Sequence, residues 1–227
     1  MNWANLLTSL NLASGTLAIC LGDPYIGGLL IILGAIFDLF DGYVARLTKK
    51  DGALGEQLDS LADVITFGVA PGVLYYHARP AELDPTFAAI VVIFLVAGTA
   101  WRLATFNVLP PSAVFRGLPS PASGLFFASW LISIQYLESW FVGWHANPVI
   151  YLALPLVFAA LMNIRAPFFS AKNFSKKGWK ALPYLTLIML TTLFIVTRPL
   201  EAGPLAIFTY ILLSIFFFPR NRNAHPK

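Results

Sequence analysis

Four aspartates within an apolar part of this sequence could do chemistry together. They lie in the stretch DLFDGYVARLTKKDGALGEQLDSLAD and are Asp38, Asp41, Asp59 and Asp63. A carboxylate inside a membrane helix costs about 2.5–3.5 kcal/mol on insertion scales, and converging carboxylates repel one another. A divalent cation would offset both costs, and ligands that are all oxygens favour Mg²⁺, Mn²⁺ or Ca²⁺ over softer metals. The stretch therefore predicts a site for one hard cation or a pair.

The spacing of these residues puts them on two helix faces. On the first helix, positions i, i+3, i+4 and i+7 are Asp38, Asp41, Gly42 and Ala45. On the second helix, positions i, i+4 and i+8 are Gly55, Asp59 and Asp63. Asp38 lies nine residues before Leu47 and Asp63 nine residues after Leu54, up to about 14 Å from the connecting loop at 1.5 Å per residue. We therefore expect a hairpin in which the two acidic stripes face each other.

A cation next to an arginine and small residues suits a phosphate, or better a pyrophosphate. Arg46 lies beside the first stripe, and Lys49 and Lys50 follow it. Mg²⁺ is commonly held by carboxylates and substrate phosphates together. Two other interpretations of the aspartates remain at this point, which are helix packing with snorkelling and the ion pathway of a cation transporter.

The elements that position these residues are predicted to be membrane helices. The chain of 227 residues is 58% hydrophobic and 11% charged, whereas a soluble domain carries about 25% charged residues. Several apolar runs approach the roughly 20 residues that cross a bilayer. We expect an all-α, polytopic integral membrane helical bundle, with residues 1–227 as one membrane domain. Eight spans are predicted, at residues 5–22, 25–47, 54–77, 85–107, 119–138, 147–164, 181–197 and 202–218.

The distribution of positive charge predicts that both termini are cytoplasmic. With the N-terminus inside, every Lys and Arg except Arg79 and Arg198 falls in an inside loop or the C-terminal tail, as the positive-inside rule requires. The net charge of +4 then reflects topology and attraction to anionic lipid headgroups, and we expect no nucleic-acid partner. The single cysteine, Cys20, excludes an internal disulfide framework and a CxxC metal site.

The acidic stretch resembles the signature of the CDP-alcohol phosphatidyltransferase family. It reads Asp38-x-x-Asp41-Gly42-x-x-Ala45-Arg46, then eight residues, then Gly55-x-x-x-Asp59-x-x-x-Asp63. The resemblance implies an integral membrane enzyme with a core of six helices, here extended by two. It also implies a homodimer that displaces CMP from a CDP-linked lipid with an alcohol, using divalent metal, Mg²⁺ or Mn²⁺, as one or two ions.

The resemblance also implies a role for each residue of the signature. Asp38, Asp41 and Asp59 would be metal ligands, and Asp63 would contact metal and act as general base on the acceptor hydroxyl. An alcohol needs such a base because its pKa lies far above 7. The cytidine diphosphate part of the lipid would be held by Thr8, Gly42, Ala45, Arg46 and Gly55.

The flanking segments resemble the phosphatidylserine synthase branch of this family. The opening NLLTSLNLASGTLAI (5–19) fits that branch, as do LDSLADVITFGVAPG (58–72), RLATFN (102–107) and FRGLPSPASG (115–124). Ala4 and Thr105 stand where the branch usually has Pro and Arg. Residues 5–124 thus carry the catalytic motif and substrate loops, and 125–227 the C-terminal helices. The implied substrates are CDP-diacylglycerol and L-serine, within a prokaryotic plasma membrane and with the active site facing the cytoplasm.

L-serine carries a carboxylate, an ammonium and a hydroxyl, so its site needs a cation, acceptors and a base. We expect Arg102 to pair with the serine carboxylate and Asn107 to orient the substrate, with Arg116 and Ser120 completing the site. Arg102 as a positive-inside anchor and Asn107 as a helix-end residue are the alternatives. A different acceptor, such as glycerol 3-phosphate or an inositol phosphate, also stays open, although a phosphorylated acceptor would want more basic residues near Asp63.

Overall fold

The computed structural model describes residues 3–48, 52–109, 117–166, 168 and 182–217. These residues form helices and no strand, which confirms the predicted all-α class. The helices are α1 (Trp3–Leu21), α2 (Pro24–Thr48), α3 (Ala53–Val64), α4 (Ala70–His77), α5 (Pro85–Val108), α6 (Ser120–Ser133), α7 (Trp140–Ala146), α8 (Pro148–Asn163), α9 (Leu182–Thr197) and α10 (Ala202–Phe217). A π-helical turn, η1 (Ile65–Val69), joins α3 to α4.

Four helical segments of the described chain are long and apolar enough to cross a bilayer. They are Trp3–Leu21, Pro24–Leu47, Ala53–His77 and Pro85–Val108. A fifth span results if α7 and α8, which are bent by 93° at their junction, count as one. The protein is therefore an integral membrane protein. The other predicted spans are observed as shorter helices, of 14 residues in α6 and 16 in α9 and α10, so eight crossings stay a prediction.

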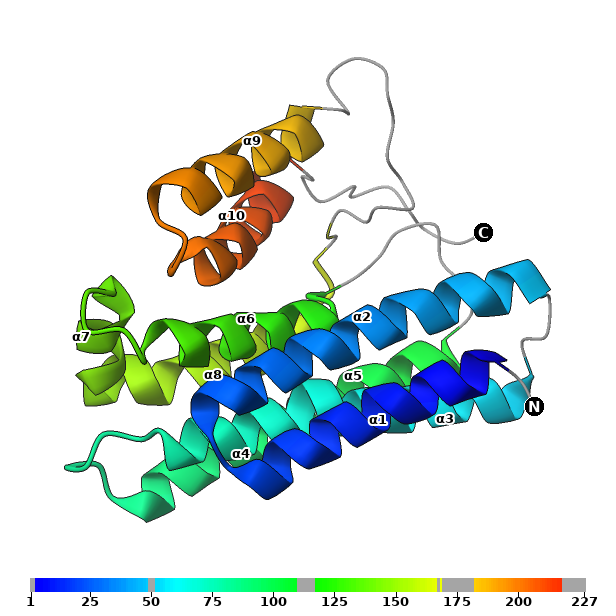
Figure 1. The fold of residues 1–227 in the computed structure, drawn as a ribbon, viewed down its shortest axis with the longest axis horizontal. Coiled ribbons are helices and arrows are strands. Elements are labelled where there is room, and N and C mark those ends of the chain that lie inside the picture. Colours follow the sequence, from blue (N-terminus) through cyan, green and yellow to red (C-terminus); the bar gives the residue numbers. More distant parts are fainter. Residues whose placement is uncertain (1–2, 49–51, 110–116, 167, 169–181, 218–227) are drawn as a thin grey trace.

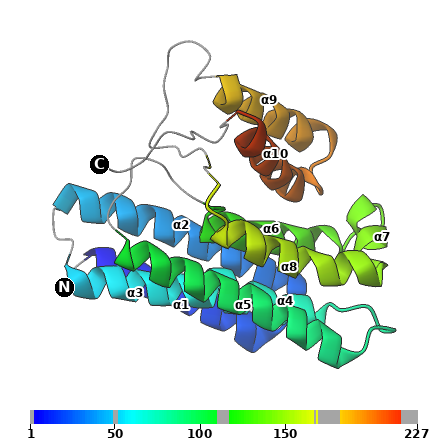
Figure 2. The same cartoon turned by 180° about the vertical axis from the view of Figure 1, so that it is seen from behind.

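The long helices α1, α2 and α5 and the continuous segment α3–η1–α4 lie side by side along the bundle, as Figures 1 and 2 show from opposite sides. α6 packs against α2, and α8 packs against α5. α9 and α10 form a separate hairpin that lies across α6. The rings of Phe126 in α6 and Phe208 in α10 meet at 5.0 Å between centroids, edge to face. The hairpin is thus attached to the bundle mainly through α10.

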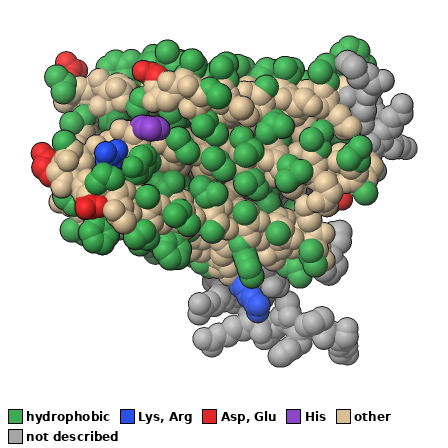
Figure 3. Space-filling view, turned by 90° about the horizontal axis from the view of Figure 1, so that it is seen from below, with side chains coloured by type: hydrophobic (Ala, Val, Ile, Leu, Met, Phe, Trp, Pro, Cys, Tyr) green, Lys and Arg blue, Asp and Glu red, His purple; other side chains and the backbone are tan. Residues whose placement is uncertain are grey.

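The outer surface of the bundle is apolar. Phe94, Ile93 and Trp101 on α5 are 55%, 64% and 72% exposed. On the face shown in Figure 3, hydrophobic side chains are spread over the whole described surface and few charged ones appear among them. Such a surface suits a lipid environment, because helices satisfy their own backbone groups and need only apolar side chains outside.

The aromatic end of the bundle, defined by Tyr75, Trp130, His145 and Tyr151, holds a group of buried polar side chains that bond to one another and to the backbone. Tyr75 and Tyr151 stack at 4.4 Å, and each hydroxyl donates to the other's backbone carbonyl, at 3.1 and 3.0 Å. The Trp130 indole Nε1 donates to His145 Nδ1 at 3.1 Å, and His145 Nε2 lies 2.6 Å from the carbonyl oxygen of Ala78. These paired groups lock α4, α6, α7 and α8 together.

The turn η1 modifies the helix that was expected over residues 54–77. α1 and α2 approach this turn closely, because a Cβ on Gly15 would lie 2.5 Å from Thr66 Oγ1 and 2.7 Å from Thr66 Cα. A Cβ on Gly34 would lie 2.6 Å from Thr66 Cγ2. A hydropathy pattern cannot distinguish a π turn from an α turn, so this turn could not be predicted from the sequence. Such turns are frequent at functional sites, and this one directly follows the turn of α3 that carries Asp63.

Candidate active site

Three carboxylates from two helices converge at the end of the bundle opposite the aromatic end. Asp38 and Asp41 lie in the C-terminal half of α2, and Asp59 lies on α3. One carboxylate oxygen from each residue lies within 4.8 Å of the others. The two acidic stripes therefore face each other, because the α2–α3 hairpin is antiparallel and the spacing puts the residues at matching depth.

This aspartate cluster, Asp38, Asp41 and Asp59, fits a hard divalent cation. All of its donors are carboxylate oxygens, the ligand type that Mg²⁺ and Mn²⁺ prefer. Asp59 Oδ1 is buried and has no hydrogen-bond partner among the described residues. A buried oxygen without a partner is costly, and a bound cation would satisfy it. The residues present can thus hold a metal ion.

Asp63 lies one turn deeper on α3 and is only 6% exposed. Its Oδ1 accepts a hydrogen bond from Asn11 Nδ2 at 3.2 Å. It is close enough to Asp38 and Asp59 for their charges to act on it. The fourth aspartate of the motif therefore belongs to the same site but is held by a separate polar contact.

Helix α1 contributes a second hydrogen bond to the aspartates. Thr8 is buried, and its hydroxyl donates to Asp41 Oδ2 at 2.7 Å. The resemblance assigns Thr8 to the nucleotide lipid, whereas the observed acceptors of its hydroxyl are Asp41 Oδ2 and, at a longer 3.1 Å, the backbone carbonyl oxygen of Ala4. Thr8 thus orients Asp41 in this structure.

Small residues of the signature lie on the same two helices as the aspartate cluster. Gly42 and Ala45 on α2, and Gly55 on α3, are half-buried. A Cβ on Gly42 would meet only Arg46 Nη1, at 3.6 Å, and a Cβ on Gly55 would meet Asn5 Oδ1 at 3.2 Å. Arg46 is exposed on the last turns of α2. An anionic ligand beside Gly42 would therefore lie close to the Arg46 guanidinium.

The residues predicted to bind serine are only partly brought to the site. Arg102 on α5 is buried, donates from Nη1 to the carbonyl oxygen of Met162 at 3.4 Å, and lies close enough to Asp63 to be attracted by its charge. Asn107 Nδ2 donates to Ser60 Oγ at 2.9 Å and so ties α5 to α3 beside Asp59. Ser120 is buried at the start of α6, and Arg116 lies outside the described residues.

The sequence interpretation missed the site contacts of Asn11, Ser60 and Met162. Asn11 stands three residues after Thr8 and therefore shares its helix face, a signal that was available in the sequence. Ser60 lies next to Asp59 but carries no distinguishing pattern. Met162 acts through its backbone carbonyl, which a pattern of side chains cannot reveal.

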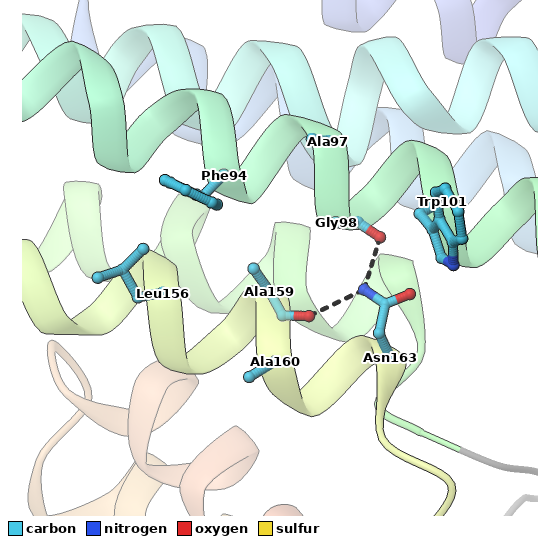
Figure 4. Close-up of a pocket in the computed structure, with 8 residues that line it drawn as sticks. All are labelled: Phe94, Ala97, Gly98, Trp101, Leu156, Ala159, Ala160 and Asn163. Atoms are coloured by element: carbon cyan, nitrogen blue, oxygen red, sulfur yellow. Dashed lines mark hydrogen bonds between the residues drawn. The ribbon is translucent and has the colours of Figure 1, made fainter.

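A separate groove of about 400 Å³ lies between α5 and α8 (Figure 4). It has no acidic or basic residue in its lining, which is Phe94, Ala97, Gly98, Trp101, Leu156, Ala159, Ala160 and Asn163. Asn163 Nδ2 donates to the carbonyl oxygens of Gly98 and Ala159, both at 2.9 Å. Because its polar lining group is bonded to backbone carbonyls and its remaining side chains are apolar, this groove offers no catalytic chemistry.

The fold and the site define a class of protein, which is a helical membrane protein with an aspartate cluster that fits a divalent cation. Comparison with known proteins shows which family of this class it is. Residues 1–159 match the family model described as CDP-alcohol phosphatidyltransferase. The chain therefore belongs to the CDP-alcohol phosphatidyltransferase family, as its signature predicts. The match covers α1 to most of α8 and so includes every described residue of the site except Met162.

Several curated relatives resemble the chain over much of their length. The CDP-diacylglycerol–serine O-phosphatidyltransferase of Helicobacter pylori is 32% identical over 223 residues, covering 93% of this chain and 88% of the relative. The protein of the same name from Methanocaldococcus jannaschii is 36% identical over 168 residues, covering 74% and 75%. The archaetidylserine synthase of Methanothermobacter thermautotrophicus is 37% identical over 142 residues, covering 59% of each.

Proposed function

We propose that this protein transfers the phosphatidyl group of CDP-diacylglycerol to the hydroxyl of L-serine and releases CMP. The observation that carries the proposal is the site itself, where a three-aspartate cluster, a fourth buried aspartate and a buried arginine come together in a family of CDP-alcohol phosphatidyltransferases. Similarity to the Helicobacter pylori serine transferase over most of both chains supports serine as the acceptor.

In the proposed reaction the serine oxygen forms a bond to the phosphorus that carries diacylglycerol, and the bond from that phosphorus to the CMP oxygen breaks. The proton of the serine hydroxyl goes to Asp63, and the bonding electrons leave with CMP. Asp63 Oδ1 accepts a hydrogen bond from the side-chain amide of Asn11, so in this proposal Oδ2 is the oxygen that takes the proton. A positioned base of this kind contributes roughly 100- to 10,000-fold to a rate.

The aspartate cluster would hold the metal in this proposal, as Mg²⁺ or Mn²⁺ and as one or two ions, with Asp63 as a further contact. When bound, the ion supplies positive charge that stabilises the pyrophosphate as CMP departs. Arg46 would pair with the same phosphates, and the small residues Gly42, Ala45 and Gly55 would let the nucleotide approach the backbone. Thr8 would serve the lipid site by holding Asp41.

Arg102 is the proposed partner of the serine carboxylate. It is a buried cation near Asp63, and one buried arginine suits a singly anionic amino acid better than a phosphorylated acceptor. Asn107, bonded to Ser60, would orient the substrate from the end of α5, and Ser120 and Arg116 would complete the site.

The distribution of Lys and Arg supports a cytoplasmic site and cytoplasmic termini, in the plasma membrane of a prokaryote. We propose a homodimer in that membrane. The mass of the purified protein in detergent, measured by light scattering, tests the dimer: a monomer mass would contradict it.

An acceptor screen tests the function. Purified protein with CDP-diacylglycerol and Mn²⁺ or Mg²⁺ should release CMP when L-serine is added, and EDTA should stop the release. Glycerol 3-phosphate and inositol phosphate are the competing acceptors. Release with one of these and not with serine would overturn the proposal.

Two variants test the assigned roles in the same assay. Asp63→Asn should lower turnover about 100- to 10,000-fold, and full turnover would remove Asp63 as the base. Arg102→Ala should raise the KM for serine, and an unchanged KM would remove Arg102 from the serine site.

A further inference from the structure

Asn11 on α1 is held from both sides in the centre of the bundle. Its side chain is fully buried. The amide Nδ2 donates to Asp63 Oδ1 at 3.2 Å, and the backbone carbonyl accepts a hydrogen bond from Thr66 Oγ1 at 2.9 Å. Asn11 thus contacts α3 through its side chain and η1 through its backbone.

The packing around Asn11 leaves its amide one productive orientation. A Cβ on Gly34 would lie 3.0 Å from Asn11 Oδ1, so α2 closes against the oxygen side of the amide. The nitrogen must face Asp63, because an amide oxygen in that place would meet a carboxylate oxygen and neither could donate. The fold therefore presents an N–H group to Asp63.

This arrangement carries a cost that packing alone does not explain. Asn11 Oδ1 is buried and has no hydrogen-bond partner in the described part of the chain. Burying a polar oxygen without a donor is unfavourable, and an apolar side chain on α1 would avoid it. What the amide provides in return is the hydrogen bond to Asp63.

Thr8 and Asn11 act in parallel from one rigid helix. They lie one turn apart on α1, and each donates to a carboxylate of a different helix, Asp41 on α2 and Asp63 on α3. α1 thus sets the orientation of both carboxylates relative to each other. The bond from Asn11 engages Oδ1 of Asp63 and leaves Oδ2 as the oxygen that does not bond to Asn11.

We propose that Asn11 is the positioning residue of Asp63, which it holds so that Oδ2 can accept the proton of the acceptor hydroxyl. This inference rests on the proposed function, in which Asp63 is the base. The competing account is that Asn11 only joins α1 to α3 as a structural contact. The two accounts differ in which kinetic constant changes when the amide is removed.

The test compares Asn11→Ala and Asn11→Leu with Ser14→Ala. Asn11→Leu keeps the approximate shape of the side chain and removes the donor without adding a charge, so it reports on the hydrogen bond even if the alanine variant folds poorly. Ser14 is the matched control, because it is a buried polar residue of α1 whose hydroxyl donates to the backbone carbonyl of Leu10 in its own helix and, among the described residues, to no aspartate. Steady-state CMP release gives kcat and both KM values, and Mn²⁺ titration by electron paramagnetic resonance gives metal affinity.

Removing the amide should lower kcat about 10- to 100-fold, the usual loss for a group that orients a metal ligand. At saturating Mn²⁺ the KM values for serine and CDP-diacylglycerol should stay within about twofold, since substrate contacts are untouched. Ser14→Ala should match the parent protein in kcat and in both KM values. Unchanged kcat in both Asn11 variants, or a loss of kcat matched by equal rises in both KM values, would overturn the positioning role.

The same assay separates this inference from the function on which it rests. If the parent protein releases no CMP with serine, the proposed function fails. If the parent protein is active, Asp63→Asn is inactive and both Asn11 variants keep full kcat, then only the role of Asn11 fails.

Discussion

At the aromatic end of the bundle, buried polar groups bond to one another, whereas at the aspartate end several of them do not. Tyr75 and Tyr151 exchange hydrogen bonds with each other's backbone, and His145 uses both ring nitrogens. At the other end, Asp59 Oδ1 and Asn11 Oδ1 are buried without a partner among the described residues.

The difference shows what each end is built for. Paired polar groups inside a low-dielectric core rigidify it, so the aromatic end holds the helices in place. Carboxylates that converge without hydrogen-bond donors repel one another, which costs stability. A bound cation and substrate would remove this repulsion. The stability of the first end supports the unfavourable arrangement of the second, which is common at functional sites.

The largest effect that separates the two ends is expected for Asp59→Asn. Removing one carboxylate from the aspartate cluster should lower both Mn²⁺ affinity and CMP release by more than about 100-fold, because even groups that only support metal ligands cost 10- to 100-fold. Mn²⁺ titration by electron paramagnetic resonance and the CMP assay measure these two quantities.

Glu56→Gln is the matched control for Asp59→Asn. It removes the same charge from an exposed position one turn earlier on α3, outside the aspartate cluster. Equal losses in the two variants would mean that general charge, and not ligation, accounts for the effect.

An intermediate effect is expected for Gly15→Ala, which acts on the support of the site. The added Cβ would lie 2.7 Å from the backbone Cα of Thr66, so α1 must move away from η1, and such overpacking costs about 1–3 kcal/mol. Because Thr8 and Asn11 move with α1, both kcat and the melting temperature should fall. Gly143→Ala, where an added Cβ meets nothing within 4 Å, should change neither. A Gly15→Ala protein with unaltered kcat would show that the position of α1 does not matter to catalysis.

The smallest effect on activity is expected for Tyr151→Phe at the aromatic end. Loss of its hydroxyl leaves the buried carbonyl of Tyr75 without this donor, which should cost about 1–3 kcal/mol of stability. The melting temperature in detergent should fall, while CMP release at a lower temperature stays unchanged. Tyr136→Phe, on a partly exposed ring, is the control and should leave both quantities unaltered. A loss of activity in Tyr151→Phe at that temperature would contradict the division between the two ends.

Much of the site could be predicted from local pattern. Helical periodicity alone places Asp38 and Asp41 on one face and Asp59 and Asp63 on another, and a hairpin with a short connection must bring such faces together. The position of Arg102 near the end of α5 could also be predicted from the sequence. The partner that holds Arg102, the carbonyl of Met162, is 60 residues away and could not be derived from spacing.

By itself the sequence determined the helical class, the approximate bounds of the helices and the aspartates that share a face, because hydropathy and the 3.6-residue period are local properties of the chain. Only the tertiary structure decided that Asn11 and Thr8 orient two different carboxylates, that η1 interrupts the third long helix, and that α7 turns sharply into α8. These features depend on which helices meet and at what distance. Close contacts such as those of Gly15 and Gly34 with Thr66 set that distance, and they exist only after the helices have packed.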